Sequence, residues 1–384
     1  MTTRSRISSL RFSTPLLLLL PLSCSSGSDR KAELAQHYVE VLHATYTDAE
    51  AGAEELDQAI TAFCDAPSAS GLEHCREVWI QARLSYQQTE ISRFYEGPID
   101  RAPDGPEGFI NAWPVDESHL RAIIADATAF PTIDATTLRE ANESGGEENI
   151  ATGWHAIEYL LWGEDLRSDG PGERDWQDFQ DGGPLPHPDR RRQVLRVASG
   201  ILVADLRQVR LEWENAYRDE FLAAGADESL RRILTGVGTL VKGELYGERL
   251  VVPWSSKSQG DEHSCFADTT HLDHLHDMIG VRNAWTGSFR SERDDRLLEG
   301  PGLRDLARGA DAARADRIDA LIERAIRLME SRAFRPFDQA ILGADNAPGR
   351  VAVQEAISAL AELSTELTGL ADDLDVAVSM ELPE

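Results

Sequence analysis

The spacing of apolar residues is the feature that most constrains the fold of this chain. From Lys31 onward apolar side chains recur three and four positions apart almost without interruption, in segments rich in Ala, Leu, Glu and Arg. This spacing places the apolar side chains on one face of an α-helix. Alternating β-branched runs, which would indicate strands, are few. The sequence therefore predicts an all-α protein, with helices at about 31–64, 72–95, 116–129, 147–162, 190–221, 227–250, 267–280, 302–332 and 349–379.

The predicted helices fall into two blocks. Residues 167–189 are rich in Gly, Pro and Asp, and we expect them to connect a first helical bundle at 31–166 with a second at 190–384. Helices of these lengths pack as antiparallel bundles. Irregular segments at 95–114 and 251–266 interrupt the two halves. Loops of this length in a compact protein are commonly functional.

Residues 1–23 have the composition of an export signal. Arg4, Arg6 and Arg11 precede an apolar core at 16–20, which is far shorter than the roughly 20 residues that span a bilayer. Cys24 stands where a lipoprotein signal places its acylated cysteine, and 24–30 would form a flexible tether. We therefore expect a periplasmic protein attached to the outer membrane only through a lipid anchor. Cleavage without acylation, which leaves a soluble periplasmic protein, is the alternative.

The chain is strongly acidic. Its formal net charge of −29 becomes −32 when the three arginines of residues 1–23 are removed. This charge argues against nucleic acid and anionic membrane surfaces as partners. It is compatible with cation binding, but solvated helix faces produce the same composition.

Cys64 and Cys75 flank a turn-like stretch between two predicted helices. In an oxidising compartment we expect them to form a disulfide that clamps this helix hairpin. Cys265 would then remain as a free, buried thiol.

His155 and Glu158 form a titratable pair within an otherwise apolar helical segment. Their three-residue spacing puts both side chains on one helix face, roughly 5 to 6 Å apart at Cβ. A buried histidine and carboxylate must be paired or metal-bound. The pair is therefore interpreted either as two ligands of a cation or as a histidine hydrogen-bonded to its own glutamate in a packed core. Two ligands hold a metal only weakly, so a metal site would need further donors.

Acidic and histidine side chains elsewhere could supply those donors. The main candidates are Glu90, Asp116, Glu244 and Glu248, and a second group lies in the densest ligand-type segment, at Glu262, His263, Asp268, His271 and Asp273. Arg249 or Lys242 provides the alternative, because either could neutralise Glu244 and Glu248 in an acid and arginine network that joins the bundles without metal, and Arg93 is a further supporting residue. Carboxylates with one histidine suit iron better than copper(I). Zinc or haem is less favoured, and the absence of Cys-x-x-Cys-His excludes covalent c-type haem.

The segment Gly153–Glu158 resembles the Gly-x-His-x-x-Glu motif of the imelysin family. Residues 111–117, 242–249 and 261–271 are also similar to family segments, in the same order. Imelysins are bacterial envelope proteins tied to iron uptake and are also classified as M75 peptidases. The resemblance implies paired helical bundles with iron or an iron-containing ligand bound between them. It also implies an envelope iron-transport partner, and Trp113 and Gly153 as supporting residues.

The chain lacks both His-Glu-x-x-His, the zinc motif of many metallopeptidases, and the Gly-x-Ser-x-Gly nucleophile elbow. We therefore assign no catalytic residues and expect iron binding without catalysis. A metal-dependent peptidase and a non-catalytic envelope protein that docks a partner remain the alternatives.

Overall fold

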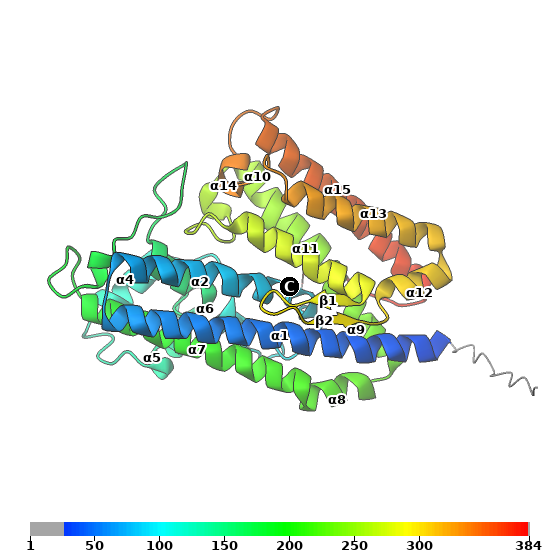
Figure 1. Cartoon of the computed structure of the whole chain (residues 1–384), viewed down its shortest axis with the longest axis horizontal. Coiled ribbons are helices and arrows are strands. Elements are labelled where there is room, and N and C mark those ends of the chain that lie inside the picture. Colours follow the sequence, from blue (N-terminus) through cyan, green and yellow to red (C-terminus); the bar gives the residue numbers. More distant parts are fainter. Residues whose placement is uncertain (1–26, 383–384) are drawn as a thin grey trace, which may run out of the picture.

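The computed structural model describes residues 27–382 and is helical almost throughout, as predicted (Figure 1). The predicted export signal and Cys24 lie outside the described residues, and residues 27–30, predicted to belong to a flexible tether, are helical instead. Within residues 27–382, none of the helices combines the length and the apolar composition needed to cross a bilayer.

Four long helices form the first bundle, which occupies the lower half of Figure 1. They are α1 (Gly27–Asp65), α2 (Ala69–Gln87), α6 (Gly153–Trp162) and α7 (Pro188–Glu214). α1 packs along α2 and α7, and α6 packs against α2 and α7. Short elements complete this half: η1 (Glu90–Ser92), α3 (Glu107–Ile110), α4 (Glu117–Ala125), α5 (Ala135–Ala141), η2 (Trp176–Phe179) and α8 (Ala216–Ala223).

The position of α7 corrects the predicted division of the chain. Residues 190–384 were expected to form the second bundle, but α7 belongs to the first because it buries Leu202, Leu206 and Val209 and packs along α1. Periodicity identified the apolar face of α7 and could not identify its partner.

The second bundle begins with a helix that runs out of the first. α9 (Ala226–Thr239) contacts α1 and continues into the π-helix η3 (Leu240–Val251), which packs on α15 (Pro348–Asp373). α11 (Thr270–Thr286) touches both α2 and α13 (Ala312–Met329), so it joins the bundles. The remaining elements are α10 (Val252–Ser256), η4 (Gln259–Asp261), α12 (Leu303–Ala310) and α14 (Phe337–Ala340). One continuous apolar core runs through both bundles.

A short hairpin is the exception to the helical pattern. β1 (Ser288–Arg290) pairs antiparallel with β2 (Leu297–Glu299). Phe289 from β1 is buried against Val41 and Ala44 of α1. The hairpin thus covers part of α1 (Figure 1).

The predicted disulfide is not formed in the structure, because Cys64 and Cys75 are both buried free thiols. Burial raises the pKa of Cys64 to about 11 and that of Cys75 to about 12. The turn between α1 and α2 is instead ordered by Ser68, whose side chain accepts a hydrogen bond from the Gly71 amide. Cys265, expected to be buried, is half-buried and also free.

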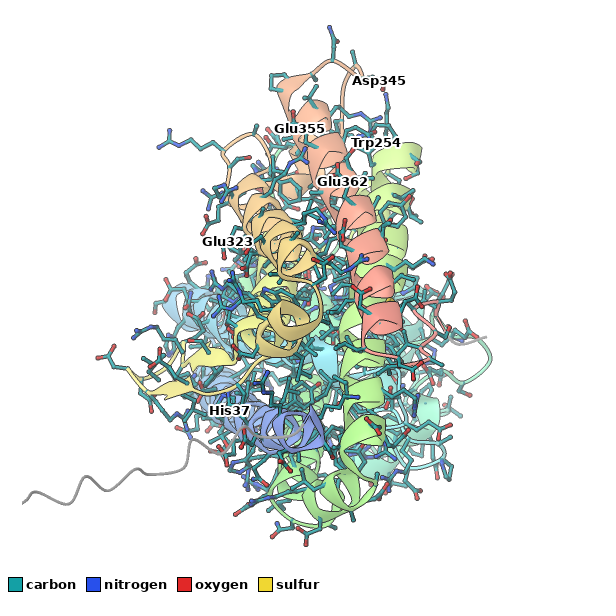
Figure 2. All side chains as sticks on the ribbon, turned by 90° about the vertical axis from the view of Figure 1, so that its right-hand side faces the viewer. His37, Trp254, Glu323, Asp345, Glu355 and Glu362 are labelled. Carbon is teal, nitrogen blue, oxygen red and sulfur yellow. The ribbon has the colours of Figure 1, made fainter. Side chains whose placement is uncertain are left out.

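Much of the acidity lies on solvated helix faces. Figure 2 labels Glu323 on α13 together with Glu355 and Glu362 on α15, and all three side chains are exposed. The net charge alone therefore does not indicate a cation site.

Candidate functional site

α6 carries His155 and Glu158 into the interior, and all of its residues are buried. Its first residue, Gly153, has φ of +80°, and a Cβ at this position would lie 2.5 Å from the Ile110 carbonyl oxygen. Only glycine fits this conformation and this close approach. His155 Nδ1 lies 2.9 Å from Glu158 Oε2, which confirms that the two side chains share a helix face.

The other nitrogen of His155 faces a cation. Arg83 of α2 lies with Nη2 3.2 Å from His155 Nε2, and it donates to Asn111 Oδ1 at 3.0 Å and to Asp273 Oδ1 at 3.0 Å. Burial and Arg83 together lower the pKa of His155, and burial raises the pKa of Glu158 despite Arg83. A guanidinium in this position repels a second cation. The geometry therefore matches the hydrogen-bonded pair rather than two metal ligands.

The Arg83 guanidinium also contacts His263, in the segment before α11, and Asp273 of α11. His263 Nδ1 lies 2.9 Å from Asp273 Oδ2, and Ser264 Oγ donates to that oxygen at 2.6 Å. The ring of Trp113 meets His263 edge-on, with centroids 5.9 Å apart. Burial raises the pKa of Asp273, but Arg83 and His263 outweigh it and hold this pKa well below its usual range. We define the Arg83 network as Arg83, Asn111, His155, Glu158, His263, Ser264 and Asp273.

Ser264, His263 and Asp273 do not form a nucleophilic triad. Such a triad needs the hydroxyl to be hydrogen-bonded to the imidazole that removes its proton. Here the Ser264 hydroxyl donates directly to the carboxylate of Asp273.

A second buried network surrounds Arg249. This arginine donates to Glu90 Oε2 at 2.7 Å and to Asp277 Oδ2 at 2.9 Å, and Arg93 donates to the same Glu90 oxygen at 3.1 Å. Burial raises the pKa of Glu90, but Arg93 and Arg249 lower it to about 2. Burial raises the pKa of Asp277, and Arg249 opposes this shift.

The π-helix decides which glutamate joins this Arg249 network. Glu244 and Glu248 were expected to share a face, as residues four apart do in an α-helix. The π-helix winds more loosely, with hydrogen bonds between residues five apart, and this brings Glu244 and Arg249 onto one side of the helix. Glu244 Oε2 lies 3.3 Å from Arg249 Nε, whereas Glu248 is exposed. Only Glu244 of the two therefore joins the Arg249 network.

Asp116 lies outside both networks. Its side chain accepts a hydrogen bond from the Ser118 amide at 2.8 Å and caps α4. Among residues 27–382, no three His, Cys, Asp or Glu side chains form a ready-made metal cage. The predicted single site that combines His155 and Glu158 with Glu90, Asp116, Glu244 or Glu248 is therefore not assembled.

A third polar region, here called the acid cluster, consists of Glu262, Asp268 and Asp338. Glu262 is 1 % exposed, and neither of its carboxylate oxygens accepts a hydrogen bond of normal geometry. Asp268 Oδ1 and Asp338 Oδ1 are also buried without partners. Asp338 Oδ2 accepts from Gln259 Nε2 at 3.1 Å. Asp165, which follows α6, contributes further negative charge.

The electrostatics of the acid cluster differ from those of the arginine networks. Burial, Asp338 and Asp268 raise the pKa of Glu262 well above its usual range, against a smaller opposing effect of the Thr270 hydroxyl. Burial and the neighbouring acids raise the pKa of Asp268 to about 8, and Arg167 opposes them only weakly. His271, next to the cluster, has a buried Nδ1 without a partner, and burial lowers its pKa to about 4.

Several residues of these regions were not among the predicted site residues, including Arg83, Asn111, Ser264, Asp277 and Asp338. Arg83 lies in the predicted helix at 72–95 that also carries Glu90, but α2 ends at Gln87 and the two side chains belong to different networks. Asp277 stands in the His- and Asp-rich stretch that begins at Glu262. Asp338 is distant in sequence from the other acids and carries no recognisable signal.

The comparisons with known proteins agree with this fold. The family model Peptidase_M75, described as Imelysin, matches residues 42–367. Iron-regulated protein A of Synechococcus elongatus is 28 % identical over 278 residues, which cover 68 % of this chain and 64 % of that protein. The match therefore spans less than two thirds of the length of that relative.

Two solved structures share the architecture at low sequence identity. An iron-regulated protein A precursor from Parabacteroides distasonis matches with a TM-score of 0.71 and 15 % identity, over 92 % of this chain and 97 % of that chain. An imelysin-like protein from Psychrobacter arcticus matches with a TM-score of 0.67 and 17 % identity, over 92 % of this chain and 98 % of that chain. Since the family model covers most of the sequence, this chain belongs to the imelysin family.

Proposed function

We propose that this protein is an exported, lipid-anchored periplasmic protein that binds iron, alone or within an iron-containing ligand, and passes it to an envelope transport partner. The printed name of the Synechococcus relative states regulation by iron and supports an iron-related role. The export signal and Cys24 of the sequence support the location.

The acid cluster carries the proposal of metal binding. Glu262 and Asp268 come from the segment between η4 and α11, and Asp338 comes from α14. Their unpartnered oxygens are buried, and a buried carboxylate requires a partner, a proton or a metal ion. Asp165 on the α6 side places negative charge from the first bundle beside acids of the second.

The chemistry of these donors fits iron better than soft metals. Carboxylate oxygens favour hard and borderline cations, and His271 offers an imidazole nearby. The three carboxylates are not arranged as a finished cage, so binding has to draw them together. By contrast, Arg83 already occupies the space beside His155 and makes that pair a poor cation site.

Calorimetric titration of the purified protein with ferrous iron, ferric citrate and zinc tests this proposal. We expect saturable iron binding that weakens at least tenfold in the double variant Glu262→Gln, Asp268→Asn, because the amides keep the shape and remove the charge. Glu323→Gln, an exposed acid on α13, should bind as the wild type does.

The variant His155→Ala, Glu158→Ala separates the two candidate locations. We expect this variant to lose thermal stability and to retain iron affinity. Loss of iron binding in this variant alone would indicate that His155 and Glu158 of α6, and not the acid cluster, bind the iron. Failure of the wild type to bind any of the three metals would reject the proposed function.

A further inference from the structure

A cavity of about 560 Å³ opens at the C-terminal end of α6, on the side of the 163–174 segment. Its walls combine apolar and cationic side chains, among them Tyr159, Trp162, Leu166, Arg121, Arg174 and Arg191. A concave site of this size, with an apolar wall and a few convergent charged groups, is typical of small-molecule binding.

The buried arginines of the cavity have too few anionic partners. The side chain of Arg174 is 8 % exposed, and its nearest carboxylate, on Asp178, lies at 3.5 Å. Its Nε is buried without a hydrogen-bond acceptor. Arg191 is also buried and donates to the carbonyl oxygens of Asp178 and Pro186 rather than to a carboxylate. Two guanidiniums therefore share the one carboxylate of Asp178, which leaves positive charge in a chain of strongly negative net charge.

The mouth of the cavity is apolar and exposed. Leu166 is 85 % exposed and Leu185 is 40 % exposed, so both present apolar surface to solvent at the mouth of the cavity. Tyr159 also lines the cavity, and the Arg174 guanidinium lies 5.3 Å from its ring centroid. The rim arginines Arg121 and Arg167 pair with Glu164 and Glu173. The uncompensated positive charge of the cavity thus lies on the buried side chains of Arg174 and Arg191.

We propose that this cavity binds a small organic carboxylate whose apolar body lies against Tyr159 and Leu166 and whose carboxylate accepts hydrogen bonds from Arg174. Planar guanidinium and carboxylate groups match each other in geometry and charge. The inference is independent of the proposed iron function, because this ligand is an anion and the acid cluster selects a cation.

A matched pair of probes tests the proposal. We expect 2-naphthoate to bind saturably in calorimetric titration, and to bind roughly tenfold more tightly than neutral 2-naphthamide of the same shape. Its affinity should also fall as the salt concentration rises. Equal affinity for the two probes, or no saturable binding of 2-naphthoate at millimolar concentration, would overturn the proposal.

Variants locate the probe. Arg174→Gln should weaken 2-naphthoate binding by roughly tenfold and leave 2-naphthamide unaffected. If Arg174→Gln folds poorly, Leu166→Glu gives a second test, because it adds a negative charge at an exposed position and should weaken naphthoate binding several-fold. Leu211→Glu, at a residue of α7 that is 42 % exposed and not part of the cavity, is the matched control. Unchanged binding in both Arg174→Gln and Leu166→Glu would place the probe elsewhere and reject the site. Iron titration of the same variants should match the wild type.

Discussion

The Arg83 network and the acid cluster draw on the same short segment, 262–273, and both are buried, but their charge is neutralised by different means. His263, Ser264 and Asp273 face a guanidinium and use their hydrogen-bonding groups on one another. Glu262 and Asp268 face other carboxylates and leave oxygens unpartnered. The segment 262–273 therefore supplies residues both to a network whose acids are paired with an arginine and to a cluster whose acids lack a cationic partner.

This difference separates structural polar groups from candidate binding groups. An arginine is a permanent counter-charge that belongs to the fold. A proton on a raised-pKa carboxyl group is exchangeable, and a metal ion can take its place. Burial and acidity, which both regions share, do not distinguish them. The identity of the counter-charge does.

The largest expected effect comes from removing that permanent counter-charge. Arg83→Met keeps an unbranched apolar stem near Trp79 and Trp154 and leaves Asp273 buried without its cation. Breaking a buried ion pair in this way costs roughly 3 to 5 kcal/mol in the free energy of unfolding. Urea denaturation measures this loss.

The control for Arg83→Met is an exposed ion pair. Arg101 and Glu220 lie 2.9 Å apart with side chains 43 % and 51 % exposed, so Arg101→Met should change stability by about 0 to 1 kcal/mol. A similar small loss for Arg83→Met would show that the Arg83 network is not the balanced structural element described above.

Removing a charge from the acid cluster should stabilise the protein, in contrast to Arg83→Met, and the size of this effect should depend on pH. Asp268 keeps its proton up to about pH 8 in the folded protein and loses it near its ordinary pKa of 3.8 in the unfolded chain. Its contribution to the free energy of unfolding therefore falls as pH rises toward 8. Relative to wild type, Asp268→Asn should become more stable between pH 6 and pH 9, by on the order of 1 kcal/mol after allowance for solvent screening.

Thermal unfolding of both proteins without metal across this pH range provides the measurement. Asp273 should not contribute in the same window, because its pKa is held well below the usual range and its stabilising effect is lost only in acid. A difference between wild type and Asp268→Asn that is constant from pH 6 to pH 9 would contradict the raised pKa of Asp268.

The smallest expected effect tests the register of the π-helix. Glu244→Gln removes a partner of Arg249 that is 16 % exposed, and should cost about 0.5 to 1 kcal/mol. Glu248→Gln, four residues later and exposed, should be neutral within about 0.5 kcal/mol. Equal losses measured by denaturation would indicate that the contact between Glu244 and Arg249 does not stabilise the fold.

Local patterns in the sequence predicted the helices and the pairing of His155 with Glu158 well, because both depend on neighbours in one helix. The same patterns could not show that α7 joins the first bundle, since periodicity reveals an apolar face and not its partner. They also placed Glu244 and Glu248 together, because no residue in Leu240–Val251 announces a π-helix.

The sequence could not predict the parts of the site that depend on tertiary contacts. Nothing near Asp338 indicates that α14 brings it to Glu262, and nothing near Arg83 indicates that His155, Asn111 and Asp273 converge on it. The cysteine spacing suggested a disulfide because sequence distance is short, but a bond also depends on the directions of the two side chains.

The complete burial of α6 has a consequence for the rates of motion. Amide protons of a helix with no exposed residue exchange with solvent only when large parts of the fold open. We therefore expect the amides of 153–162 to be among the slowest-exchanging in the protein. A solute can reach His155 only during such rare openings, whereas the cavity at the C-terminal end of α6 borders solvent and can fill and empty while the fold stays closed.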